Sequence, residues 1–171
     1  MSDVSATPVT EAPGIFGLLE KRRAQIANEQ VLAVEVPRWN NPKLVIKFKP
    51  VPHESLKRGA IATERAMKDG DAKKLAEVEL NTNAALLVEA CISITAILGD
   101  GTECGMGVDG ALTRFDADLA IALGMPESST HIAVCRNLFI ADGDLLLTSK
   151  KLGEWSGYRT DSIEEAIVGE S

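Results

Sequence analysis

The chain has 171 residues, of which 45% are hydrophobic, 25% charged and only 4% aromatic. This length suits one compact domain with a core of mainly Ala, Leu, Ile and Val, and this composition excludes a chain that is disordered throughout. The formal net charge of -7 argues against a protein that mainly binds nucleic acid, because binding to phosphates depends on Lys and Arg. We therefore expect no nucleic-acid partner.

After residues 1–14, which we expect to be a disordered tail, the chain begins a short amphipathic helix. Residues 15–27 place apolar side chains at helical spacing, with the basic cluster 21–23 on the other side. A different pattern follows: two alternating runs rich in Val and Ile flank the turn residues NNP, which predicts an N-terminal β-hairpin over about 31–51. Pro37 has no backbone N–H, so the first strand is expected at a sheet edge.

Two helices are predicted next. The helical pattern that begins at His53 ends at Gly70, and Asp71 is the expected N-cap of the following helix. Apolar residues then recur at steps of four and three, which predicts a helix over about 72–98, the longest in the chain. The stripe comprises Leu80, Ala84, Leu87, Cys91, Ile94 and Leu98. It fits a dimer interface as well as a core, so self-association stays open.

Short helices are predicted for the rest of the chain. Asp116 is the expected N-cap of a helix that ends at Gly124, and two further helices are predicted over 127–140 and up to Trp155. These elements form a short-helix subregion at about 115–156.

The complete pattern predicts an α+β fold that is predominantly helical, with the N-terminal β-hairpin packed on about six helices. We expect a single globular domain over residues 15–156, whose long helices extend to about residue 99. Residues 157–171 are acidic and are expected to form a loose C-terminal tail.

Cysteine usage and hydropathy bear on the compartment. Cys91, Cys104 and Cys135 are odd in number and far apart, which is typical of free thiols in a reducing cytoplasm. The longest apolar run spans residues 84–98 and contains Glu89, so it is too short to cross a bilayer, which needs about 20 residues. We expect a cytoplasmic protein without a membrane partner.

Residues 104–110, CGMGVDG, match the dinucleotide-binding fingerprint G-x-G-x-x-G. The fingerprint functions where its glycines join a buried strand to a helix whose N-terminus faces the pyrophosphate. Here a helix is predicted before the glycines, no amphipathic helix directly follows them, and Glu103 and Asp109 would repel an anionic ligand. We interpret the stretch as a surface turn and expect no cofactor.

No other constellation predicts catalysis or metal binding. His53 and His131 are the only histidines, and no Cys-x-x-Cys spacing is present, so we expect no metal site. Cys135 lies four residues after His131 on one predicted helix, and such neighbours do not make a catalytic triad; we interpret Cys135 as core packing. The residues favour a protein that is not an enzyme and works through protein–protein interaction.

Several motifs occur together over residues 31–171. Pro37 and Trp39 end the first predicted strand, and a late tryptophan, Trp155, closes the last predicted helix. Between them lie the pattern F-D-x-x-L-A-x-x-L-G and a helix that ends in L-F-x-x-D. The matching residues are Phe115, Asp116, Leu119, Ala120, Leu123 and Gly124, then Leu138, Phe139 and Asp142. In these motifs the chain resembles the tail assembly chaperones of siphophages that infect actinobacteria.

The resemblance implies a bacteriophage protein of the host cell cytoplasm that acts in viral tail assembly and is not retained in the virion. Its partner would be the tape measure protein, whose long apolar helices it keeps soluble while tail-tube subunits polymerise; the major tail protein is a further candidate partner. In many relatives a programmed ribosomal frameshift adds a C-terminal extension to a minority of copies. The alternative is a structural phage tail or head-completion protein that stays in the virion.

A chaperone of this kind needs accessible apolar surface beside charge that keeps it soluble. The predicted helices 15–27 and 127–140 could supply this surface, although each could instead cover the protein's own core. The client-binding residues that we predict on them are Ile15, Phe16, Leu18, Leu19, Ile132, Leu138 and Phe139.

Overall fold

The computed structural model describes residues 14–158, and the chain divides into two compact units, residues 1–30 and residues 31–171. The described part of the first unit contains one helix, α1 (Ile15–Glu29). We expected a single domain over residues 15–156, whereas the structure assigns α1 to a unit of its own. The tails predicted at residues 1–14 and 157–171 lie almost wholly outside the described residues.

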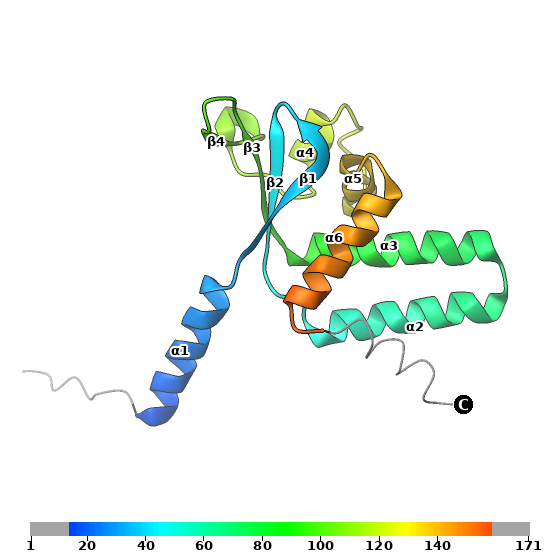
Figure 1. Cartoon of the computed structure of the whole chain (residues 1–171), viewed down its shortest axis with the longest axis horizontal. Helices are drawn as coiled ribbons and strands as arrows, with labels where there is room; N and C mark the ends of the chain where they lie inside the picture. The colour runs from blue at the N-terminus through cyan, green and yellow to red at the C-terminus, as the bar shows by residue number, and fades with distance from the viewer. Residues whose placement is uncertain (1–13, 159–171) are drawn as a thin grey trace, which may run out of the picture. The chain divides into compact units, whose positions relative to one another are not determined.

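A four-stranded antiparallel sheet forms the centre of the second unit (Figure 1). Its strands are, in spatial order, β1 (Leu32–Asn40), β2 (Lys43–Phe48), β3 (Cys91–Ile97) and β4 (Glu103–Gly105). In the register of β1 and β2, Asn40 lies opposite Lys43, and the register shifts between Glu35 and Asn40, where Pro37 is located. β1 and β2 are the first two strands of this larger sheet.

The strand β3 replaces the last part of the predicted long helix. The helix α3 (Ala72–Ala90) ends where β3 begins, so the predicted helix over 72–98 is wrong beyond residue 90. β3 is a central strand with burial on both faces, and its apolar residues are therefore nearly continuous and fit a helical stripe as well as a strand. The β-branched side chains of Ile92 and Ile94 favour the strand.

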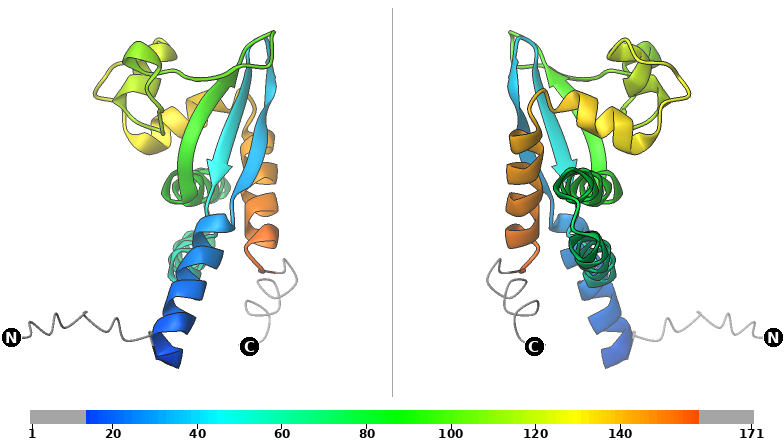
Figure 2. Two further views of the ribbon diagram at one scale, coloured as in Figure 1. Left: turned by 90° about the vertical axis from the view of Figure 1, so that its left-hand side faces the viewer. Right: turned by 90° about the vertical axis from the view of Figure 1, so that its right-hand side faces the viewer.

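The remaining helices surround the sheet. They are α2 (His53–Asp69), α4 (Ala117–Ala122), α5 (His131–Leu138) and α6 (Asp142–Trp155), with a short 3₁₀ turn η1 (Val108–Gly110). α2 and α3 pack side by side, and α3 also packs against α5 and α6 (Figure 1). Figure 2 shows α6 beside β1, whereas α4 lies on the side of β3.

Two predicted helix starts are confirmed at the level of their caps. The Asp71 carboxylate accepts hydrogen bonds from the backbone N–H groups of Lys73 and Lys74 at the start of α3. The Asp116 carboxylate accepts one from the backbone N–H of Leu119 in α4. Such caps satisfy N–H groups that have no partner within the helix.

The core lies between the inner face of the sheet and the helices α3, α5 and α6. Its fully enclosed members include Leu44, Ile46, Phe48, Leu87, Ile94, Phe115, Leu119, Leu138, Leu145 and Leu152. Alternate residues of β2 point into this cluster, as expected for a strand with one face on a core. Across residues 14–158, no helix combines the length and apolar character needed to cross a membrane.

Candidate functional site

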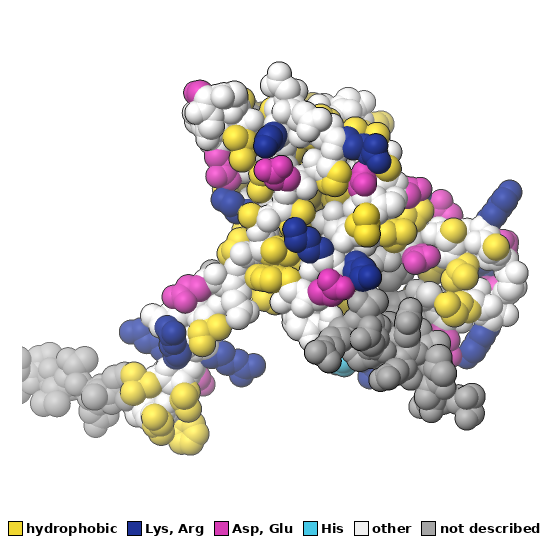
Figure 3. All heavy atoms as spheres, viewed as in Figure 1, with side chains coloured by type: hydrophobic (Ala, Val, Ile, Leu, Met, Phe, Trp, Pro, Cys, Tyr) yellow, Lys and Arg dark blue, Asp and Glu magenta, His cyan; other side chains and the backbone are white. Residues whose placement is uncertain are grey.

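The helix α1 carries the exposed part of the predicted client-binding surface. Phe16 is 80% exposed, and Ile15, Leu18 and Leu19 are also exposed. A single helix of 15 residues has no core of its own, and short helices are only marginally stable without packing. The apolar side chains of α1 are therefore suited to contact with a partner. Figure 3 shows them gathered at the N-terminal end of the helix.

Basic residues follow the apolar ones along α1. Lys21, Arg22 and Arg23 occupy the next turn, and Figure 3 shows this positive charge beside the apolar group. At about 100° per residue, Arg22 and Arg23 project within the arc that runs from Leu18 to Phe16. The expectation that the basic cluster 21–23 lies on the other side of the helix is therefore wrong for these two residues, and α1 has no cleanly apolar face. A helix that lies in a membrane surface needs such a face. α1 does not have one.

The other predicted client-binding residues lie in or against the core. Leu138 is 0% exposed and Phe139 is 3% exposed, while Ile132 is partly buried against the same cluster. α5 packs on α3, and it is shorter than the predicted helix over 127–140. Ile132, Leu138 and Phe139 therefore do not form an exposed surface, because they cover the protein's own core.

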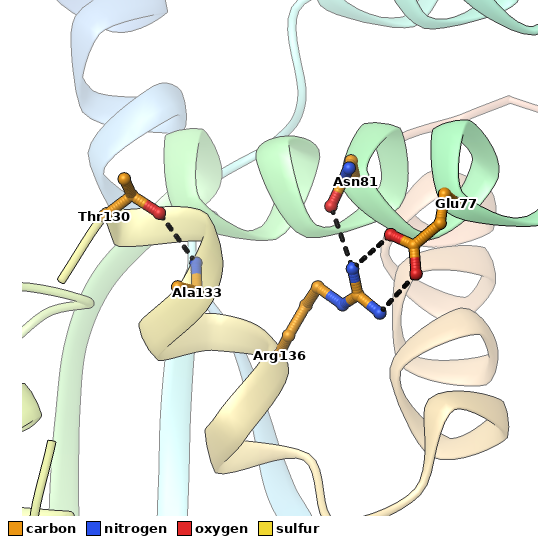
Figure 4. A network of polar contacts seen from close by, with 5 residues as sticks. All are labelled: Glu77, Asn81, Thr130, Ala133 and Arg136. Carbon is orange, nitrogen blue, oxygen red and sulfur yellow. Dashed lines mark hydrogen bonds and ion pairs between the residues drawn. The ribbon is translucent and has the colours of Figure 1, made fainter. Parts of the chain in front are cut away.

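Polar contacts fix α5 in this position (Figure 4). The Thr130 hydroxyl accepts a hydrogen bond from the backbone N–H of Ala133 at 3.1 Å and caps the helix. The Arg136 guanidinium donates to both carboxylate oxygens of Glu77, at 2.7 and 3.3 Å, and to the Asn81 side-chain oxygen at 3.2 Å. These hydrogen bonds and the charge of Arg136 hold the pKa of Glu77 below its usual value. α5 is thus tied to α3 by charge as well as by packing.

The glycine-rich stretch 104–110 is a tightly packed turn. Gly105 ends β4, and a Cβ atom there would lie 2.2 Å from the carbonyl oxygen of Ala111. The backbone N–H of Gly107 donates to the same oxygen at 2.9 Å. The short turn η1 lies within the stretch and ends at Gly110, and α4 begins several residues later, at Ala117. The stretch therefore lacks the direct strand-to-helix turn that the dinucleotide fingerprint requires.

The buried cysteines are not placed for nucleophilic chemistry. Burial raises the pKa of the Cys91 thiol to about 12 and also raises the pKa of Cys135 well above its usual value. Both thiols are protonated at neutral pH, and a protonated thiol is a poor nucleophile. The Nδ1 atom of His131 contacts the backbone oxygen of Phe115. Within the described residues, no group of three or more His, Cys, Asp and Glu side chains is placed to hold a metal ion.

The structure contains a further surface feature that the sequence reasoning missed. An open groove of about 380 Å³ lies between α2, α3 and α6. Four leucines supply its apolar lining, namely Leu56, Leu86, Leu146 and Leu147. Gly153, a glycine within α6, also lines this groove.

Comparison of the chain with models of known protein families, with curated proteins and with solved structures finds no match in any of the three. These comparisons assign no family and no function. The surface features of α1 and of the groove, together with the sequence motifs, are therefore the basis for a functional proposal.

Proposed function

We propose that the chain is a tail assembly chaperone of a siphophage that infects actinobacteria. It binds the tape measure protein in the host cytoplasm, keeps the apolar helices of this client soluble and promotes assembly of the tail tube. It acts without enzymatic chemistry and leaves the tail before the virion matures. The frameshifted longer product that the resemblance implies belongs to the same proposal.

The observation that carries this proposal is that α1 lies in a compact unit of its own and exposes its apolar residues. The apolar residues of α1 are exposed, and they precede a basic turn that keeps the helix soluble. Exposed apolar residues grouped on one element mark interaction sites, because a folded protein buries such residues unless a partner covers them. A helix of this kind can pack against the apolar face of a client helix. The tape measure protein enters the proposal as the client because the motifs over residues 31–171 resemble those of the tail assembly chaperones.

Deletion of residues 1–30 tests the role of α1. The second unit retains the sheet and the core, so the shortened chain is expected to keep the melting temperature of the full chain. We expect it to lose binding to the tape measure protein encoded in the same phage genome, measured by co-purification after co-expression. Co-purification of equal amounts of client with both chains would show that α1 is not the binding element.

Mass spectrometry of purified phage particles separates the proposal from its alternative. A chaperone is absent from particles and present in the lysate of infected cells. A structural tail or head-completion protein is present in the particles in a constant number of copies. Finding the chain there in stoichiometric amount would contradict the proposal.

A further inference from the structure

Arg22 lies inside the apolar arc of α1 rather than beside it. At about 100° per residue, its side chain projects between those of Leu18 and Ile26, about 40° from each. On the surface of a helix, a residue contacts those three and four positions away. For Arg22 these neighbours are Leu18, Leu19, Gln25 and Ile26. None of them is charged, so the guanidinium has no acidic neighbour in its own helix.

The acidic residues of α1 are not placed to neutralise this charge. Glu20 projects outside the arc, beyond Phe16, and Glu29 lies about 10 Å further along the helix axis than Arg22. Within residues 14–158, neither Arg22 nor Arg23 forms a salt bridge. Both guanidinium groups are therefore left to water or to a partner.

A partner that covers the apolar arc removes the Arg22 guanidinium from water. Burial of a charge without an opposite charge is unfavourable. The long stem of an arginine can pack on apolar surface while its head stays in water, but Arg22 has apolar side chains on both sides within the arc. A carboxylate across the interface solves this problem, because it accepts two parallel hydrogen bonds from the planar guanidinium. The arc thus fits an apolar partner that carries an acidic residue.

A second copy of α1 is a poor occupant of the same arc. Arg22 is the middle residue of this 15-residue helix, so two fully overlapping copies place Arg22 opposite Arg22 in both the parallel and the antiparallel arrangement. Like charges that face each other across an interface repel and select against that pairing. In coiled coils, a polar residue at one core position selects the partner in the same way. The charge favours a partner that differs from this chain.

We infer that the client segment bound by α1 is a helix with an acidic side chain opposite Arg22, and this inference rests on the proposed function. Apolar residues of the client helix cover Leu18, Leu19 and Ile26. The Asp or Glu between them accepts the hydrogen bonds of the Arg22 guanidinium, and Arg23 adds to the attraction. The apolar contacts supply most of the affinity, whereas the ion pair fixes the register of the client helix and excludes wrong partners.

Replacement of Arg22 by methionine has opposite effects for an acidic and for a purely apolar partner. Arg22→Met keeps a long side chain and removes the charge, so the acidic residue of the client is buried without a partner. With the co-expressed tape measure protein as probe, we expect the ratio of co-purified client to chain to fall at least about tenfold. Arg22→Lys should lose less, because it keeps the charge without the guanidinium fork. Lys21→Met removes a charge outside the arc and should leave the ratio unchanged.

The natural chain and these variants should have the same melting temperature, because the substituted residues are exposed on α1. Equal or greater recovery of client with Arg22→Met would show that the partner is purely apolar at this point and would overturn the inference. An equal loss with Lys21→Met would also overturn it, since the effect would then follow net charge. Failure of the natural chain to retain any client would instead refute the proposed function.

Photo-crosslinking from position 26 identifies the client residues that face Arg22. Ile26 is 41% exposed and lies about one turn after Arg22. A photoreactive residue in its place should crosslink to a client peptide that contains Asp or Glu about one helical turn away. Exchange of the charges, with Arg22→Glu in this chain and Arg in place of that acid, should restore the binding that Arg22→Glu alone removes. A crosslink to a second copy of this chain, or to a client segment without an acidic residue, would overturn the inference.

Discussion

Truncation of Leu138 to alanine separates core residues from surface residues among those predicted to bind the client. Leu138 is 0% exposed, and its side chain lies within the cluster between α5 and the sheet. Removing a buried leucine side chain leaves a cavity and costs about 2–5 kcal/mol. In a unit of this size 1 kcal/mol corresponds to about 4 °C, so the melting temperature should fall by about 8–20 °C.

Leu19→Ala in α1 is the matched variant, because Leu19 is 59% exposed. Truncation of a surface leucine changes the free energy of unfolding by less than about 0.5 kcal/mol. Differential scanning calorimetry and urea unfolding of both variants measure the two values. Destabilisation of less than about 1 kcal/mol by Leu138→Ala, or a similar loss from both variants, would refute the assignment of α5 to the core and α1 to the surface.

Three further predictions follow from contacts in the second unit. Gly105→Ala should destabilise the chain by about 1–3 kcal/mol in urea unfolding, because the new methyl group would overlap the backbone of Ala111, 2.2 Å away; an unchanged midpoint would contradict this packing. Arg136 lowers the pKa of Glu77, so the Glu77 carboxylate stabilises the fold above its unfolded pKa near 4.5, and this contribution is lost as the pH falls below that value. In Glu77→Gln the free energy of unfolding should therefore decrease less between neutral and acid pH than in the natural chain. Equal acid sensitivity of the variant and the natural chain would count against this ion pair. Iodoacetamide at pH 8 should modify Cys104 in the native chain and leave the two buried cysteines unmodified until denaturant is added, as mass spectrometry of the peptides would show.

Much of the helical part of the fold was predictable because local signals mark helix ends. Asp71 and Asp116 were recognised as N-caps from the sequence, and both make the expected hydrogen bonds. The end of the helix α3 had no such signal. The chain passes directly from Ala90 into β3 without glycine or proline, and a strand buried on both faces has no alternating pattern. A stripe of apolar residues alone does not distinguish these two structures.

Of the predicted client-binding residues, those on α1 are exposed and those on and beside α5 are not, and the sequence pattern could not separate the two groups. The helices α1 and α5 both contain apolar residues at helical spacing, and periodicity shows that a face is apolar without showing what covers it. Contacts between residues distant in sequence determine whether an apolar face is covered, since α5 packs on α3 and its Arg136 donates a hydrogen bond to Glu77. α1 lies in a different unit and keeps Phe16 exposed. The groove was not predicted because its walls, α2, α3 and α6, come from separate parts of the chain.

Client solubility measured with a double variant of α1 tests the central claim most directly. Phe16→Ser with Leu19→Ser removes two exposed apolar side chains, and Leu112→Ser, just after the glycine-rich stretch 104–110, is the control at similar exposure. Each chain is co-expressed with the tape measure protein of the same phage, and the soluble fraction of the client is quantified after centrifugation. The account predicts soluble client with the natural chain and with the control, and aggregated client with the α1 double variant at unchanged melting temperature. Equal client solubility with and without the natural chain would contradict the chaperone function itself.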